Sequence, residues 1–114
     1  ESHFMRTFIH IRDIAFSWLF AIDNLEKMKG EVFNVGSSKM NYSKKDICEK
    51  IAKKTDAYFH YAEIGEDADK RNYVVSYEKI NKLGFETTIS MGDGIDELIK
   101  ACSAVTFKTP YMNI

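Results

Sequence analysis

The chain has 114 residues, of which 45% are hydrophobic and 29% are charged, a composition typical of one globular domain. Its 16 basic and 17 acidic side chains give a formal net charge of -1, so no electrostatic excess favours a nucleic-acid or membrane partner. The aromatic content excludes a disordered chain. No apolar run is long enough to span a bilayer and no signal peptide is recognisable, so we expect a cytoplasmic protein.

The N-terminal residues predict a strand. Residues 4–10 alternate, with Phe4, Arg6, Phe8 and His10 on one face. Arg6 thus shares a strand face with Phe8 near the start of the chain.

An apolar helix is expected to follow this strand, with Asp13 as a candidate N-cap and Gly30 beyond its end. Apolar residues cover nearly its whole circumference, so we expect the helix to be buried on more than one side. A domain of this size rarely buries a peripheral helix in that way on its own. One face of the helix is therefore expected to pack against another domain.

The middle of the chain predicts a short buried strand at 31–36, a polar connection, and an amphipathic helix. Ser43 stands three residues before Asp46, which is the spacing of a capping box at the start of that helix. Its apolar stripe consists of Ile47, Cys48, Ile51 and Ala52. We interpret the lysines on its other face as solvated side chains, in preference to a phosphate or nucleic-acid patch.

Two further strands are predicted in the second half, at 57–64 and 71–76, joined by an acidic turn. Ser76 is expected to cap a short helix over 77–82, and Gly84 is expected to end it. The two ends of this short helix are thus predicted from single residues, Ser76 and Gly84.

The last predicted helix covers 91–103, with Ser90 as its N-cap. Helices and strands alternate throughout, which predicts an α/β or α+β fold with a small mixed sheet and flanking helices. We expect one domain over 1–104 and a C-terminal tail over 105–114.

The reactive residue types show no catalytic or metal-binding pattern. Cys48 and Cys102 lie in apolar helical patterns, so we expect reduced thiols that serve as packing, in preference to a disulfide or a nucleophile. The histidines lack metal-ligand spacing. The glycine spacing matches neither a dinucleotide-binding turn nor a P-loop.

Two arginines stand in unusual settings. Arg6 shares a strand face with Phe8, and Arg71 opens a predicted strand after the acidic turn. A guanidinium group presents a planar fork suited to phosphate, and a nearby aromatic ring suits a base or sugar face. The alternative is that both form surface ion pairs, and Asp67 and Asp69 are local candidates to pair with Arg71.

Four segments together resemble extended short-chain dehydrogenases, the NAD-dependent epimerases and dehydratases that act on nucleotide sugars. The segment "RTFIHIRDIA" is similar to the R-x-[FY]-[IV]-H-[VI]-x-D-[LIV]-A motif of this family, and "GEVFNVGS" to its G-x-[VI]-[YF]-N-[VI]-G-S strand. The segments "DADKRNYVVSYEKINKLGFE" and "ISMGDGIDELIKA" resemble the family's later arginine-to-L-G-[WF] stretch and its closing helix. Their order and spacing match over roughly residues 1–101.

This resemblance implies that the chain is the C-terminal, substrate-binding domain of such an enzyme. It implies that Arg6 and Arg71 contact the substrate pyrophosphate and that Phe8 lies near the nucleotide, with Lys70 as an alternative to Arg71. Thr7 stands where many relatives have aspartate, and Phe8 where many have tyrosine, so any tyrosine hydroxyl contact is lost.

The family's catalytic machinery is expected to lie outside this chain. The G-x-x-G-x-x-G turn that binds NAD and the Y-x-x-x-K catalytic pair are both absent from the sequence. We therefore expect an N-terminal dinucleotide-binding domain to precede residue 1 in the parent enzyme. The chain alone is expected to contribute no catalytic residue, to bind no NAD, and to be inactive.

A second hypothesis is a free-standing interaction or self-associating module derived from the same fold. In that case the apolar first helix would be its binding face. We expect the isolated chain to form a homodimer that covers this helix. A lysine-rich nucleic-acid binder is disfavoured by the nearly neutral net charge.

Overall fold

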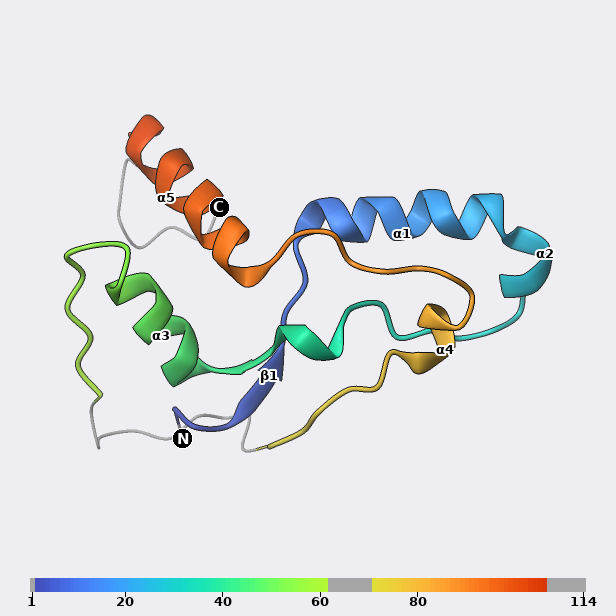
Figure 1. The fold of residues 1–114 in the computed structure, drawn as a ribbon, viewed down its shortest axis with the longest axis horizontal. Coiled ribbons are helices and arrows are strands. Elements are labelled where there is room, and N and C mark those ends of the chain that lie inside the picture. The colour runs from blue at the N-terminus through green and yellow to red at the C-terminus, as the bar shows by residue number, and fades with distance from the viewer. Residues whose placement is uncertain (1, 62–70, 107–114) are drawn as a thin grey trace.

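The computed structural model describes residues 2–61 and 71–106 and shows an α+β arrangement of helices with one small sheet (Figure 1). In chain order the elements are β1 (Met5–Thr7), α1 (Ile11–Asp23), α2 (Leu25–Met28), the 3₁₀ helix η1 (Ser38–Met40), β2 (Asn41–Ser43), α3 (Lys44–Ala52), α4 (Glu78–Asn81) and α5 (Met91–Ala104). The helices α1, α2 and α4 lie toward one end of the molecule, and α3 and α5 toward the other. The predicted fold class is thus confirmed at the level of α+β, whereas the sheet formed by the described residues is antiparallel and not the predicted mixed sheet.

The sheet has two antiparallel strands, in which Arg6 pairs with Tyr42 and Met5 with Ser43. The strand predicted at 4–10 therefore exists but is shorter, because the chain leaves the ladder after Thr7. Its partner β2 lies inside the segment predicted as a polar connection. A polar strand of three residues carries no alternation that the sequence could reveal.

Helix α1 begins at Ile11, with His10 as its N-cap. The His10 Nδ1 atom accepts a hydrogen bond of 3.1 Å from the Arg12 backbone. The predicted cap, Asp13, is instead inside the first turn and is only 1% exposed. Its carboxylate accepts hydrogen bonds from the segment that leads into α5, so the prediction of a cap at Asp13 is wrong.

Local capping signals placed two helices correctly. Ser43 and Asp46 form the predicted capping box at the start of α3, and the Ser90 side chain caps α5. The short helix predicted over 77–82 exists as α4, but the predicted cap is wrong, because Tyr77 and not Ser76 stands at its N-cap position. Gly84 lies beyond the helix in a left-handed conformation at φ 101°.

Three predicted strands do not form in the described residues. The segments 31–36, 57–61 and 71–76 are extended or irregular, and no backbone ladder joins them. Residues 62–64 of the second prediction, and the acidic turn after them, lie outside the described residues. A strand requires a neighbouring strand to pair with its backbone N–H and C=O groups. The segments 31–36 and 71–76 are joined instead by a side chain, because the Asn34 amide donates a hydrogen bond to the Ser76 carbonyl at 3.2 Å.

A small apolar core holds α4 against the rest of the chain. Tyr77, Ile80 and Phe85 are at most 5% exposed. The partly buried side chains packed around them are Phe20, Met28, Phe33, Val35 and Val75. The Tyr77 hydroxyl also forms a hydrogen bond with the Thr7 hydroxyl. The core thereby connects α1, the segment before β2 and the end of β1.

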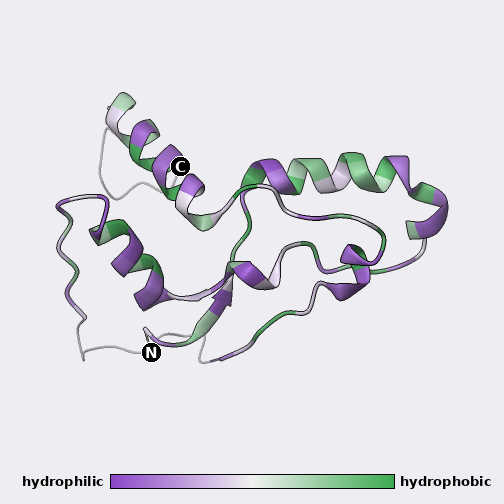
Figure 2. Ribbon diagram, in the orientation of Figure 1, coloured by the Kyte–Doolittle hydropathy of each residue, from purple (hydrophilic) through white to green (hydrophobic). Residues whose placement is uncertain are grey.

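Most of the large apolar side chains of α1 remain exposed in the described chain. Figure 2 shows green, hydrophobic turns along this helix, with purple and pale turns between them. Ile11 and Trp18 are each 70% exposed, and Ile22 is 67% exposed. The buried residues of α1 are polar, Asp13 and Ser17. Burial on more than one side, expected from the sequence, therefore does not occur within the described residues.

Candidate functional site

Arg6 and Arg71 lie together although they are 65 positions apart in the sequence, because the Arg6 Nη1 atom donates a hydrogen bond to the Arg71 carbonyl oxygen. The same Arg6 atom donates to the Met5 carbonyl at 2.9 Å. A guanidinium group has donors enough for both carbonyls and for other partners. The structure thus brings together the two arginines that the sequence indicated.

The Tyr73 ring lies close to the guanidinium groups of both arginines. The Arg6 Cζ atom lies 5.6 Å from the centre of this ring and the Arg71 Cζ atom lies 6.0 Å from it. Arg6 also lies 6.0 Å from the Phe4 ring. We call Phe4, Arg6, Arg71 and Tyr73 the arginine cluster.

The position of the cluster follows from β1. Arg6 is inside the strand, where its backbone is fixed by pairing with Tyr42. The Met5 backbone N–H donates to the Asn72 side chain at 2.9 Å. This hydrogen bond fixes the segment that carries Arg71 and Tyr73 beside the strand. Lys70, the alternative to Arg71, and Asp67 and Asp69 lie outside the described residues.

Phe8 lies in a different environment from the arginine cluster. It lines an apolar cavity of about 400 Å³ between α3 and α5, together with Ile47, Ile51, Ile95 and Leu98. The Phe8 backbone N–H donates to the Met40 carbonyl at 3.0 Å. The predicted sharing of a site by Phe8 and Arg6 is therefore not what the described contacts show: Phe8 lines the apolar cavity, and Arg6 lies at the rings of Phe4 and Tyr73.

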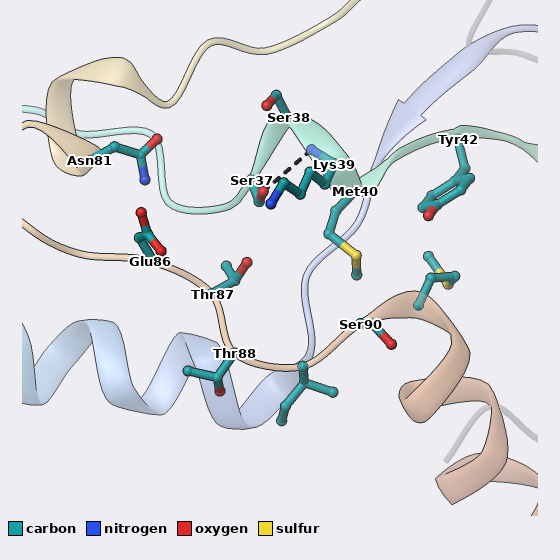
Figure 3. A pocket seen from close by; sticks show the side chains of 12 residues that line it. Ser37, Ser38, Lys39, Met40, Tyr42, Asn81, Glu86, Thr87, Thr88 and Ser90 are labelled. Carbon is teal, nitrogen blue, oxygen red and sulfur yellow. Dashed lines mark hydrogen bonds between the residues drawn. The ribbon is translucent and has the colours of Figure 1, made fainter.

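A polar cleft of about 440 Å³ lies between residues 37–42 and 86–91 (Figure 3). Several of its polar side chains already have partners. The Ser37 hydroxyl accepts from the Lys39 backbone, and the Asn81 amide donates to the Phe85 carbonyl at 2.7 Å. The cleft is connected to the arginine cluster through Tyr42, which lines it and pairs with Arg6 in the sheet.

Two opposite charges face this cleft from its two walls. Lys39 comes from η1 and Glu86 from the segment after α4. Neither forms an ion pair with another of the described residues, and Figure 3 shows the Glu86 carboxylate directed toward Asn81. The polar runs "SSK" and "TTIS" were the only sequence signals for the cleft, and the fold alone brings them together.

Perturbed acidic groups lie at helix ends and on the surface, outside the arginine cluster. Hydrogen bonds from the Ser43 hydroxyl and backbone lower the pKa of Asp46, and bonds from Ser90 lower the pKa of Asp93 in the same way. A hydrogen bond from Lys79 lowers the pKa of Glu31. Each is explained by a cap or a surface ion pair, so these groups identify no acid–base centre.

The remaining candidates for a reactive or metal-binding site are the cysteines and the possible metal ligands. Cys48 is half-buried and both cysteines are free thiols, but Cys102 is exposed, so the expected packing role is wrong for Cys102. In the described parts of the chain, no group of His, Cys, Asp and Glu residues is arranged to hold a metal ion. Likewise, none of the helices in those parts has the length and apolar character required to cross a membrane.

The site is therefore a cationic and aromatic cluster beside a polar cleft, an arrangement that can bind an anion. A scan of the chain against protein-family models finds no family that matches. The interpretation of the site consequently depends on the contacts described above and on the sequence motifs.

Proposed function

We propose that this chain is the substrate-binding part of an NAD-dependent nucleotide-sugar epimerase or dehydratase, in which Arg6 and Arg71 bind the pyrophosphate of the substrate. The observation that carries this proposal is that Arg6 and Arg71, 65 positions apart in sequence, lie at one aromatic ring: the Arg6 guanidinium donates to the Arg71 carbonyl oxygen, and each guanidinium carbon lies within 6.0 Å of the Tyr73 ring centre. Each planar fork is suited to two oxygens of a phosphate group.

In the proposed enzyme, cofactor chemistry and substrate binding belong to two different domains. NAD, bound by a separate dinucleotide-binding domain, supplies the hydride chemistry in this enzyme class. The residues of this chain bind and orient the substrate, and the chain alone is inactive. Binding energy from the pyrophosphate, which does not react, would position the sugar for reaction elsewhere.

The exposed face of α1 supports a second domain. Ile11, Trp18 and Ile22 are each at least 67% exposed on one helix. Contiguous apolar surface of this kind usually marks an interaction site. In the proposed enzyme this face packs against the dinucleotide-binding domain.

The pyrophosphate contact is tested by titrating the chain with UDP- and dTDP-sugars while following backbone amide shifts. We expect weak shifts near Arg6 and Arg71 that are lost in Arg6→Ala and in Arg71→Ala. Arg12→Ala is the matched control, because Arg12 is an exposed arginine that pairs with Glu97 on α5. Shifts that survive both test variants, or that disappear equally in the control, would contradict the proposal.

Phe8 stays a predicted nucleotide contact and is tested in the same titration. Phe8→Leu keeps an apolar side chain in the cavity between α3 and α5 and removes the aromatic ring. We expect it to weaken nucleotide-sugar binding while leaving binding of inorganic pyrophosphate unchanged. An unchanged affinity for both ligands would limit Phe8 to packing.

The exposed face of α1 also favours a second candidate function, a self-associating or protein-binding module derived from the same fold. Light-scattering chromatography of the isolated chain separates the possibilities of monomer and dimer. A dimer that Trp18→Lys converts to a monomer, together with no response to nucleotide sugars, would favour this module over the enzyme domain.

A further inference from the structure

The two ring nitrogens of His10 face different partners, one at the start of α1 and one on α5. The Nδ1 atom accepts a hydrogen bond of 3.1 Å from the Arg12 backbone N–H and so caps α1. The Nε2 atom lies 3.6 Å from the Glu97 carboxylate on α5. Only a ring without a proton on Nδ1 can accept the first hydrogen bond, so the capping form is the neutral imidazole that carries its proton on Nε2.

The His10 ring is packed between α1 and α5 and is only 13% exposed. A Cβ atom added to Gly94, in the first turn of α5, would lie 3.4 Å from the His10 Cδ2 atom. The side chains from η1 and α3 that line the apolar cavity together with His10 are Met40, Ile47 and Ile51, and none of them carries a charge.

The charged groups around the ring come from α1 and α5. Glu97 faces Nε2, and the Arg12 guanidinium forms an ion pair with the same carboxylate. Asp13 accepts its hydrogen bonds from the segment before α5, and Asp93 is part of the cap of α5. Among the described residues, Glu97 is therefore the acidic group placed to respond to a positive charge on His10.

We infer that protonation of His10 exchanges its contacts, releasing the cap of α1 and strengthening the attachment to α5, so that His10 is a pH-sensitive joint between the two helices. A proton on Nδ1 turns the acceptor into a donor that faces the Arg12 N–H, and α1 loses its side-chain cap. The new charge also lies at the helix end that disfavours cations. It is attracted by the Glu97 carboxylate, where it competes with the Arg12 guanidinium.

The exchange changes the partner of His10 more than the stability of the fold, because the lost cap and the stronger ion pair oppose each other. Histidine side chains take up a proton between about pH 5 and 8, a range in which carboxylates stay largely ionised. The hydrogen bonds from Thr88 and Ile89 to Asp13 therefore continue to tie α1 to the segment before α5. The structural change is confined to the first turn of α1.

The test is an NMR titration of the 114-residue chain between about pH 8 and 5, following the His10 ring nitrogens and the Arg12 backbone amide. At the high end we expect the ring proton on Nε2. As the ring is protonated, the Arg12 amide proton should shift upfield by more than those of its neighbours, because it loses its hydrogen bond. His10→Asn keeps a capping side chain that does not titrate and should remove this shift. No ligand is present, so the result is independent of the proposed function.

Glu97→Gln tests the contact with α5. It removes the charge of the carboxylate, and we expect the proton affinity of the His10 ring to fall by about twofold to fivefold, the effect of a partly exposed ion pair. Glu49→Gln is the matched control, because Glu49 is an exposed glutamate of α3 that pairs with Lys45.

Three results would each overturn the inference: a ring proton on Nδ1 at high pH, an Arg12 shift that persists in His10→Asn, or equal proton affinities in Glu97→Gln and Glu49→Gln. Circular dichroism establishes the folding of each variant. Should His10→Asn fail to fold, His10→Ser, which also caps helices and does not titrate, replaces it in the same titration.

Discussion

The Asp13 carboxylate accepts two hydrogen bonds from Thr88, at 3.0 Å from its backbone nitrogen and 2.9 Å from its hydroxyl. The backbone N–H of Ile89 donates a third, at 3.1 Å. These residues are separated by at least 75 positions, so Asp13 ties the start of α1 to the segment that leads into α5. A carboxylate that is 1% exposed is tolerated here because its oxygens are satisfied.

Replacing Asp13 by alanine should therefore destabilise the chain strongly. Three charge-assisted hydrogen bonds are lost and their donors are left without a partner, so we expect the free energy of unfolding to fall by about 2–3 kcal/mol. Asp13→Asn keeps the shape and should cost less. Urea denaturation measures both, with Asp23→Ala at the exposed end of α1 as the control. Equal stability of Asp13→Ala and the control would contradict the role of Asp13 as a tie.

Gly36 should be intolerant of any side chain because Tyr77 occupies the space beside it. A Cβ atom at this position would lie 2.6 Å from the Tyr77 Cε1 atom and 2.8 Å from its Cζ atom. The Tyr77 ring is buried and its hydroxyl bonds to Thr7, so it has little freedom to move aside. We expect Gly36→Ala to lower the unfolding free energy by about 1–3 kcal/mol, as overpacking of a core does.

The matched control for Gly36 is Gly92→Ala. Gly92 is in the first turn of α5, and the nearest side-chain atom to an added Cβ is the Ser90 hydroxyl oxygen, at 3.7 Å. Alanine favours the helix by about 0.5–1 kcal/mol relative to glycine. Thermal unfolding should therefore show opposite signs for the two substitutions. Equal effects would indicate that the contact of Gly36 with Tyr77 is not restrictive.

The acid sensitivity of the chain should depend on two helix caps. Hydrogen bonds from the Ser43 side chain and backbone lower the pKa of Asp46, and those from Ser90 lower the pKa of Asp93. In the unfolded chain both groups have an ordinary aspartate pKa of about 3.9. The folded state thus binds fewer protons, and the stability that the caps contribute is present above this pKa and is lost as the pH falls through the lower folded pKa.

The measurement is urea unfolding at several pH values between about 5 and 2.5, a window that includes the ordinary aspartate pKa and extends below it. Ser43→Ala and Ser90→Ala remove the hydrogen bonds from the hydroxyl groups and keep those that involve the backbone, so the pH dependence should flatten in part in each and most in the double variant. Ser103→Ala, a serine at the end of α5 outside both caps, is the control. An unchanged slope in the double variant would show that other carboxylates determine the acid sensitivity.

Those caps also show which parts of the fold the sequence could predict. Ser43 with Asp46, and Ser90 with its helix, are signals within one turn of chain, and both predictions are confirmed. A strand is different, because its backbone groups require a partner that the local sequence does not name. For that reason 31–36 and 71–76 had the composition of strands without forming a ladder, whereas the polar strand β2 forms one with β1.

The candidate site was accessible from the sequence only in part. Motif spacing selected Arg6 and Arg71, and the structure places them together. Tyr73 was not selected, because only the return of the chain past β1 brings its ring to both arginines. Lys39 and Glu86 face one cleft for the same reason, being contributed by segments that no short-range pattern connects.

The exposed face of α1 gives the last prediction, because Trp18 is the only tryptophan of the chain and is 70% exposed. Its fluorescence therefore reports directly on whether this face is covered. We expect emission typical of a solvated indole at low concentration and a shift to shorter wavelength as concentration rises, since a second copy would remove apolar surface from water. Ile22→Glu, on the same face, should abolish the shift, whereas Lys27→Glu, in the short helix α2, should leave it. Constant emission together with a monomeric mass at high concentration would contradict self-association through α1. In that case the same fluorescence signal, followed while a dinucleotide-binding domain is added, would test whether that domain covers the face.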